Sequence, residues 1–283
     1  MRLVTFQNNG SAEPAVIVGD RLLGLKAAGF STLLDIIEQG APALQRVSAL
    51  MKSAPADGMI PLSKARLLTP LSRPPKLIFI GLHYRDHAAE CGAKIPEVPT
   101  VFSKYNSSII GPDDEIVLPK LSAQPDYEAE LAIVIGKKGR YIPKDRWREF
   151  VFGYTNLHDV SARDVQMATS QWMMGKTFDT FAPIGPAIVT ADEIPDPNAL
   201  KIELILNGEV MQSSNTAEMV FHVPYLIEHL SSVMTLEPGD IISTGTPAGV
   251  GMAKKPQRWL RPGDETIVRI EGIPELRNSV RAE

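Results

Sequence analysis

The sequence contains a single cysteine, Cys91. One thiol cannot form an internal disulfide, and it excludes zinc sites built from several cysteines. No apolar run approaches the roughly 18 residues that a membrane-spanning helix needs, and the first ten residues, MRLVTFQNNG, lack the charged-then-apolar pattern of a secretory signal. The chain also lacks a basic excess, because 29 basic against 33 acidic residues leave a net charge of -4. These absences argue against nucleic-acid and membrane partners and predict a soluble, cytoplasmic protein.

Length and composition indicate a globular protein with one large and one small domain. The chain has 283 residues, of which 44% are hydrophobic and 22% charged, so a sizeable core can be buried. Residues 1–72 are predicted to form a small α+β domain in which Thr32 caps a helix that closes at Gly40. The segment Ser72–Pro75, with its two prolines, is typical of a linker. Residues 73–283 then form the larger domain.

In the larger part, short strand patterns outnumber helices and do not alternate with them, which disfavours a doubly wound parallel sheet. The predicted strands lie at residues 77–80, 131–135, 187–190, 202–206, 241–244 and 266–270. Asn207-Gly208 predicts a hairpin. The spacing of apolar residues predicts a helix over 223–234, and another helix is expected to begin near Ser161. The fold class is therefore α+β, mainly β and mainly antiparallel.

Two glutamates, Glu128 and Glu130, lie two residues apart where a strand is expected to begin. Alternate residues of a strand share a face, so unpaired carboxylates there repel each other, and a divalent cation such as Mg²⁺ or Mn²⁺ relieves the repulsion. The alternative is a strand whose polar face is merely solvated. Asp159, at the end of a second predicted strand, adds a third carboxylate and favours the metal site. The adjacent His158 points the opposite way and is expected to be structural.

A histidine and a glutamate follow the apolar strand at 77–80. His87 and Glu90, three residues apart, would meet on one face of a short helix, where the carboxylate can orient the imidazole as a general base. An ordinary surface contact is the alternative. Cys91 has no evident catalytic partners and is expected to pack.

Two further segments offer groups for an anion. Lys176 lies among turn-forming and aromatic residues and is a candidate for holding a substrate carboxylate or stabilising negative charge, the alternative being a solvated lysine. The glycine-rich run from Ser243 to Gly251 lacks the Lys-Ser/Thr pair of a phosphate loop. We expect Thr246 and backbone N–H groups of this run to face a carboxylate, with a tight β-turn as the alternative.

Taken together, these segments resemble the fumarylacetoacetate hydrolase family. The matching blocks occur in the family's order and cover most of residues 75–283: Gly81–Glu90, Phe102–Lys104, Asp126–Gly136, His158–Asp164, Gly175–Pro186 and Thr244–Gly251. The variant Gly-Lys-Thr-Phe-Asp-Thr-Phe at 175–181 looks closest to the small bacterial and mitochondrial members. One departure is His83, because many relatives carry asparagine there.

The resemblance implies the fold, the partners and the roles of nine residues. The fold would be a fumarylacetoacetate hydrolase-type β-roll or partly open barrel, with residues 73–283 as the catalytic domain, and the protein a homodimer. The implied roles are metal ligands of Mg²⁺ or Mn²⁺ for Glu128, Glu130 and Asp159, catalytic roles for His87, Glu90 and Lys176, and substrate-binding positions for Lys104, Gln166 and Thr246. His87 and Glu90 would activate water on a lid between Gly81 and Gly92, mobile when empty and ordered over a bound 2-oxo acid.

The implied function is a divalent-metal-dependent hydrolase that cleaves a carbon–carbon bond in a 2,4-dioxo acid of the acylpyruvate type and releases pyruvate. Its leaving group is a pyruvate enolate, which the metal and Lys176 would stabilise. Oxaloacetate decarboxylation needs the same enolate and is the first alternative. The alternative of another class is a non-catalytic, β-rich module that binds a cation for stability.

Overall fold

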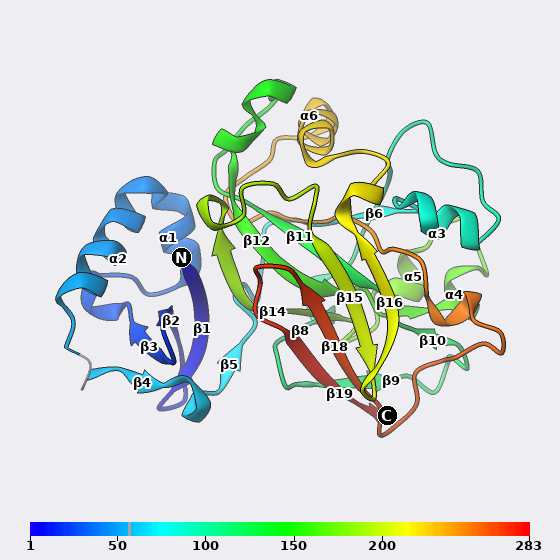
Figure 1. Cartoon of the computed structure of the whole chain (residues 1–283), viewed down its shortest axis with the longest axis horizontal. Coiled ribbons are helices and arrows are strands. Elements are labelled where there is room, and N and C mark those ends of the chain that lie inside the picture. Colours follow the sequence, from blue (N-terminus) through cyan, green and yellow to red (C-terminus); the bar gives the residue numbers. More distant parts are fainter. Residues whose placement is uncertain (56–57) are drawn as a thin grey trace.

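The computed structural model describes residues 1–55 and 58–283. A small lobe built around β1–β4, α1 and α2 lies beside a larger, strand-rich body that carries the C-terminus (Figure 1). The α-helices within these residues are α1 (Leu33–Gln39), α2 (Ala41–Ser53), α3 (Arg85–Glu90), α4 (Arg163–Gln166), α5 (Met173–Lys176) and α6 (Val223–Val233). Within the described ranges, every helix is too short or too polar to cross a bilayer.

A twelve-stranded sheet runs through both parts of the molecule. Its order is β4 (Ile60–Pro61), β3 (Arg21–Gly24), β2 (Ser11–Val18), β1 (Arg2–Asn8), β14 (Ala182–Thr190), β12 (Val151–His158), β11 (Ala129–Ile135), β17 (Ile241–Ser243), β6 (Leu77–Gly81) and β7 (Thr100–Ser103). Off this path, β5 (Leu67–Leu68) pairs with β1, and β8 (Ile109–Ile110) pairs with β14. The sheet ends at the edge strands β4 and β7, so the strands described here stay open and do not close into a barrel.

A second sheet of five strands packs against this one, in the order β16 (Glu209–Asn215), β15 (Lys201–Leu206), β18 (Glu265–Ile270), β19 (Leu276–Ala282) and β9 (Glu115–Leu118). A small ribbon joins β10 (Pro125–Asp126) to β13 (Ser161–Ala162). Asn207 and Gly208 both have positive φ and form the predicted hairpin turn between β15 and β16. Only three strand pairings of the described chain are parallel, β8 with β14, β6 with β17, and β9 with β19. The predicted mainly antiparallel α+β class is confirmed.

The N-terminal residues join the large sheet through β1, which pairs with β14 at Arg2↔Val189 and Leu3↔Ile188. Helix α1 begins as predicted, because Thr32 accepts a hydrogen bond from the Asp35 N–H and forms a capping box, and the helix closes at Gly40. The domain boundary at residue 72 stays a prediction.

The central strand β11 is buried on both faces. Leu131, Ile133 and Ile135 belong to the core shared with the five-stranded sheet and α6. Ala132 and Val134 belong to the core shared with α1 and α2. Each large apolar side chain buried in this way contributes about 1.5–3 kcal/mol, so packing on two sides fixes the strand and the polar residues at its start.

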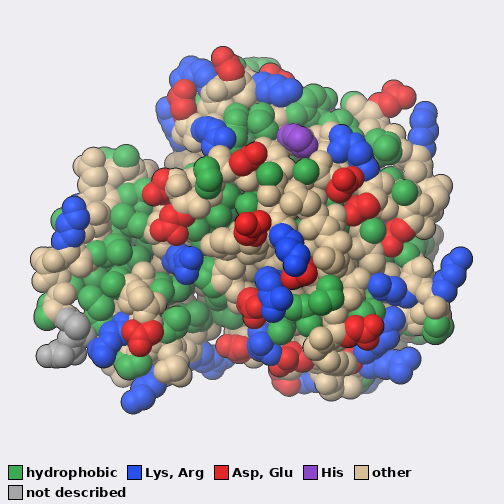
Figure 2. All heavy atoms as spheres, in the orientation of Figure 1, with side chains coloured by type: hydrophobic (Ala, Val, Ile, Leu, Met, Phe, Trp, Pro, Cys, Tyr) green, Lys and Arg blue, Asp and Glu red, His purple; other side chains and the backbone are tan. Residues whose placement is uncertain are grey.

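The surface carries charges of both signs. On the face shown in Figure 2, basic and acidic side chains are interspersed. Such a face is consistent with the expected lack of nucleic-acid partners, which stays a prediction.

Candidate active site

The ends of two neighbouring strands bring three carboxylates together. β11 begins directly after Glu128 and carries Glu130, and β12 ends directly before Asp159. The strands pair antiparallel with Ala129 opposite His158, and the Asp159 N–H donates to the Glu128 carbonyl at 3.0 Å. The start of one strand and the end of the other therefore lie at the same edge. The three side chains are buried, and one carboxylate oxygen of each lies within 4.8 Å of the others.

Basic side chains compensate part of this negative charge. Lys176 Nζ, at the end of α5, lies 2.7 Å from both Glu128 Oε2 and Asp159 Oδ2. Arg163, at the start of α4, places Nη2 2.6 Å from Glu128 Oε1. Burial alone would raise the pKa of Glu128, but Lys176 and Arg163 lower it far below its ordinary value. Glu128 is therefore held as a carboxylate.

Glu130 is held by neutral donors instead. It accepts hydrogen bonds from Ser243 Oγ and, at 2.8 Å, from the Gly245 N–H. Burial and the charges of Asp159 and Glu128 raise the pKa of Glu130 well above its ordinary value. Three buried carboxylates that converge in this way fit a hard divalent ion, which takes oxygen ligands.

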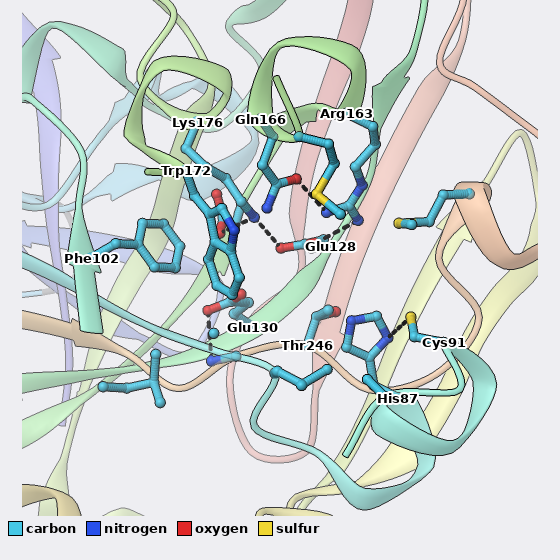
Figure 3. Close-up of a pocket in the computed structure, with 18 residues that line it drawn as sticks. His87, Cys91, Phe102, Glu128, Glu130, Arg163, Gln166, Trp172, Lys176 and Thr246 are labelled. Carbon is cyan, nitrogen blue, oxygen red and sulfur yellow. Dashed lines mark hydrogen bonds and ion pairs between the residues drawn. The ribbon is translucent and has the colours of Figure 1, made fainter. Parts of the chain in front are cut away.

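The carboxylates form one wall of a cavity of about 270 Å³. Phe102 and Trp172 line a second side, Lys176 extends from α5, and His87 enters from α3 (Figure 3). The volume is near the lower limit of ligand pockets and suits a small acid rather than an extended one.

His87 is oriented by a carboxylate that is itself anchored. Its Nδ1 lies 2.7 Å from Glu90 Oε1, and Glu90 Oε2 accepts a hydrogen bond from the Gly249 N–H at 2.8 Å. Burial lowers the pKa of His87, but its contacts with Cys91 and Glu90 raise it, to about 9 overall. The second ring nitrogen, Nε2, is turned toward the cavity (Figure 3). The ring is thus placed for proton transfer at Nε2.

The glycine-rich loop after β17 presents backbone N–H groups to carboxylates of the protein itself, and its expected role toward a substrate carboxylate stays a prediction. Gly245, Gly249 and Gly251 donate to Glu130, Glu90 and Asp126, respectively. Gly245 has φ +79°, and a Cβ there would lie 2.7 Å from the Ile80 carbonyl oxygen, so this position requires glycine. Thr246 lines the cavity, and its Oγ1 accepts a hydrogen bond from Gln212 Nε2 at 2.8 Å.

Comparison with known proteins places this site in a family. Residues 76–281 match the family model described as fumarylacetoacetate (FAA) hydrolase C-terminal. The chain belongs to the fumarylacetoacetate hydrolase family. Its relatives include oxaloacetate tautomerase Fahd2a, mitochondrial, of Rattus norvegicus, which is 46% identical over 289 residues, covering 99% of this chain and 91% of the relative. Oxaloacetate tautomerase FAHD2A, mitochondrial, of Bos taurus is 45% identical over 290 residues, with the same two shares covered.

Solved structures of the fumarylacetoacetate hydrolase family share the fold over the whole chain. Fumarylacetoacetate hydrolase from Exiguobacterium antarcticum is 38% identical, with a TM-score of 0.88 and 100% of both chains covered. Maleylpyruvate hydrolase from Sphingobium sp. SYK-6, in complex with manganese (II) ion and pyruvate, is 31% identical. Its TM-score is 0.85, with 100% of this chain and 99% of that one covered.

The predicted cytoplasmic location is contradicted by the family comparison, because the rat, cattle and human oxaloacetate tautomerases that this chain resembles are named as mitochondrial proteins. The prediction depended on the lack of a secretory pattern and of a membrane-spanning run. Both features bear on export and membrane insertion, and neither distinguishes the cytoplasm from the inside of an organelle.

Seven of the nine site residues expected from the family line the cavity: His87, Glu128, Glu130, Asp159, Gln166, Lys176 and Thr246. Glu90 is not among the lining residues and contacts His87 Nδ1 through Oε1. Lys104 is buried, donates to the carbonyls of Val160 at 2.9 Å and Phe181 at 2.6 Å, and forms an ion pair with Asp159. These contacts orient the Asp159 carboxylate. The assigned catalytic, substrate-binding and metal roles stay predictions.

Arg163 and Trp172 are among the cavity residues that the sequence did not predict as site residues. Arg163 also donates to Gln166 Oε1 at 3.0 Å and pairs with Asp126 at 2.8 Å, so it ties the α4 segment to the carboxylates. Its place in the matching block 158–164 was the available signal. Trp172 packs on Gly81, where a Cβ would overlap its ring, and only the fold reveals that contact.

Three other polar residues that the sequence analysis discussed, Cys91, His158 and His83, have different surroundings. Cys91 does not pack as predicted, because it is exposed, lines the cavity and places Sγ 3.8 Å from His87 Nδ1. His158 is fully buried and is not among the residues that line the cavity, in agreement with a structural role. His83 Nδ1 lies 2.5 Å from the Thr244 carbonyl oxygen, and its Nε2 accepts a hydrogen bond from the Phe221 N–H. Burial lowers the pKa of His83 to about 4.

Proposed function

We propose that this protein is a divalent-metal-dependent oxaloacetate tautomerase, which interconverts the keto and enol forms of the acid. The observation that carries the proposal is that one small cavity holds three carboxylates, the Lys176 ammonium and the His87 ring. Enolisation next to a carbonyl needs these two functions, stabilisation of an oxyanion and a group that moves a proton. The relatives named as oxaloacetate tautomerases support this choice of substrate.

Glu128, Glu130 and Asp159 would hold Mg²⁺ or Mn²⁺. When bound, such an ion supplies Lewis-acid stabilisation of the charge that develops on the 2-oxo oxygen. Lys104 and Lys176 keep the Asp159 carboxylate fixed, and Arg163 does the same for Glu128.

The protein's own residues account for the proton transfers. In the keto-to-enol direction, the C3–H bond breaks and its proton passes to Nε2 of the neutral His87 ring. His87 then returns this proton to the C2 oxygen, which completes the enol and restores the neutral ring. Glu90 fixes the ring through Nδ1, so that Nε2 is the nitrogen that faces the substrate. Lys176, on the wall of the cavity, stabilises the enolate oxygen. Phe102 and Trp172 exclude bulk water from this intermediate.

Carbon–carbon hydrolysis of an acylpyruvate is the second candidate. The His87–Glu90 pair favours it, because the same imidazole can deprotonate a water for attack on a distal carbonyl. The maleylpyruvate hydrolase neighbour, with its manganese and pyruvate, supports it as well. Oxaloacetate decarboxylation uses the same enolate and differs in releasing carbon dioxide and pyruvate.

One set of assays separates the three reactions. The purified protein with Mg²⁺ or Mn²⁺ is given oxaloacetate in D₂O, and exchange of the C3 protons is followed by NMR together with pyruvate release. In a parallel assay it is given an acylpyruvate, and pyruvate release is followed. Fast exchange without pyruvate supports the tautomerase, whereas pyruvate from oxaloacetate or from an acylpyruvate identifies the decarboxylase or the hydrolase. No metal-dependent turnover of either acid would favour the non-catalytic cation-binding module.

The variant Lys176→Met tests the role of the ammonium within the proposed reaction. Loss of one charge-stabilising donor costs about 10²–10³-fold in kcat, so the exchange rate should fall by that amount. Lys94→Met is the matched control, because the Lys94 side chain is 89% exposed and pairs only with the equally exposed Glu97 at 3.7 Å among the described residues. If the Lys176→Met protein has the same exchange rate as the Lys94→Met control, Lys176 does not take part in the reaction.

A further inference from the structure

The end of α3 carries a second group of metal-ligating side chains, apart from the three carboxylates. His87, Glu90 and Cys91 stand at spacings of three and four residues, so they share one face of the helix. One ligand atom of each residue lies within 4.8 Å of the other two. His87 Nδ1 is 2.7 Å from Glu90 Oε1 and 3.8 Å from Cys91 Sγ.

We propose that His87, Glu90 and Cys91 form a second metal site that takes Zn²⁺ or another thiophilic divalent ion. The chemistry of the donors distinguishes the two sites. A nitrogen, a carboxylate oxygen and a thiolate are the ligands of Zn²⁺, whereas three carboxylates suit Mg²⁺ or Mn²⁺. The cavity thus contains two different sites: the three carboxylates suit a hard ion, and the group of His87, Glu90 and Cys91 suits a softer one.

The distances require only a small adjustment. Zinc–nitrogen and zinc–sulfur bonds of about 2.0–2.3 Å in tetrahedral geometry separate neighbouring ligand atoms by roughly 3.5 Å. The two measured separations, 2.7 and 3.8 Å, lie on either side of that value. Glu90 is already fixed through its other oxygen, which accepts the Gly249 N–H, so Oε1 needs to exchange only its contact with His87 Nδ1 for the ion.

The position of the group gives an ion access. Cys91 is exposed, and both Cys91 and His87 line the cavity, so an ion can enter from that side. Three protein ligands leave the fourth tetrahedral position open to a water or to an acid in the cavity. An ion at this place takes His87 Nδ1 from Glu90 and changes the orientation and charge of the ring. Zn²⁺ should therefore inhibit any reaction that uses His87, although binding itself does not depend on the proposed function.

Cobalt spectroscopy tests the site directly. Co²⁺ replaces Zn²⁺ and gives a thiolate-to-metal charge-transfer band in the near ultraviolet, which carboxylate ligands do not give. Because Cys91 is the only cysteine of the chain, a band in the full-length protein saturated with Mg²⁺ reports on this thiol alone. We expect the band to appear, to disappear when Zn²⁺ is added, and to be absent in Cys91→Ser.

Two further variants show whether the thiol acts with its neighbours. His87→Ala and Glu90→Gln should each weaken Co²⁺ binding, followed by the band, by more than about 10-fold, since even outer-shell changes at metal sites cost 10–100-fold. Glu130→Gln, which alters the carboxylate cluster, and Glu97→Gln, an exposed control on the following segment, should leave the band and its affinity unchanged. The proposal is overturned if the parent protein gives no band. It is equally overturned if His87→Ala and Glu90→Gln bind Co²⁺ as tightly as the parent, because Cys91 then acts as a lone thiol.

Discussion

At the scale of single residues, the substitution Glu130→Gln tests the proposed metal site with little disturbance of the fold. Glutamine at this position keeps an oxygen that can accept from Ser243 Oγ and the Gly245 N–H, the two donors that Glu130 binds. Glu130→Gln should therefore fold normally and lose a metal ligand. We expect kcat to fall at least about 100-fold, more than outer-shell changes cost, and Mg²⁺ or Mn²⁺ to stop raising the melting temperature.

Calorimetric titration and thermal melts with and without the metal measure both effects. Glu115→Gln is the matched control, because Glu115 is an exposed acid on β9 that pairs only with Arg281 at the surface among the described residues. A Glu130→Gln protein that binds the metal as tightly as this control would show that Glu130 is not a ligand.

The lowered pKa of His83 predicts that the protein loses stability in acid. Its folded-state pKa of about 4 lies below the ordinary 6.5, so between these values the unfolded chain binds a proton that the folded protein does not. The free energy of unfolding therefore falls as pH falls from 6.5 to 4, by up to about 3 kcal/mol from this group. In His83→Asn, which removes the titrating ring, urea unfolding should depend less steeply on pH over this range.

The control for that series is His222→Asn, since His222 is exposed. If His83→Asn loses as much stability between pH 7 and pH 4.5 as the parent protein does, His83 is not the group responsible.

At the scale of elements, α3 carries the prediction of a lid. In the structure the segment forms the helix Arg85–Glu90, followed by Gly92 at φ +62°, and its mobility stays a prediction. Oxalate, a mimic of the pyruvate enolate, should slow amide hydrogen exchange across residues 82–92 by bridging the carboxylate wall and His87. The β15–β16 hairpin serves as the internal reference, because its exchange should not change. Equal protection of residues 82–92 with and without oxalate would contradict the predicted lid.

The same elements show what the sequence can predict. β11 was predictable because the apolar run Leu131–Ile135 follows Glu128 and Glu130, and β12 because a segment rich in aromatic and β-branched residues leads up to Asp159. α5 has four residues, too few for a helical period to appear. Its contact between Lys176 and Glu128 joins residues 48 apart in sequence, and such a pairing depends on tertiary packing. The motif resemblance identified Lys176 as a site residue, which the hydrophobic periodicity of so short a helix could not do.

At the scale of the whole molecule, the expected homodimer can be tested through stability. Dimerisation stabilises the folded state by mass action, so the melting temperature should rise with protein concentration. Light scattering at the same concentrations gives the mass directly. A constant melting temperature together with the mass of a single 30.9 kDa chain would contradict the dimer.

The continuity of the large sheet leads to a prediction for the unfolding of the entire chain. β1 pairs with β14, and one buried cluster contains Leu3 and Ile36 of the N-terminal part together with Phe79 and Val134 of the body. Separating the two parts would leave Ile188 and Val189 of β14 without their partners on β1 and would open this shared core. We therefore expect a single calorimetric transition whose van't Hoff and calorimetric enthalpies agree.

Replacing Leu3, which is fully buried in that core, sharpens the test. Leu3→Ala should destabilise the protein by about 2–5 kcal/mol, and because the parts unfold together, the single transition should move to lower temperature as a whole. Arg2→Ala, beside it on β1 and about half exposed through its side chain, keeps the β1–β14 ladder and should shift the transition little. If Leu3→Ala instead splits the melt into an early N-terminal step and an unshifted main step, residues 1–72 unfold as an independent domain despite the shared sheet.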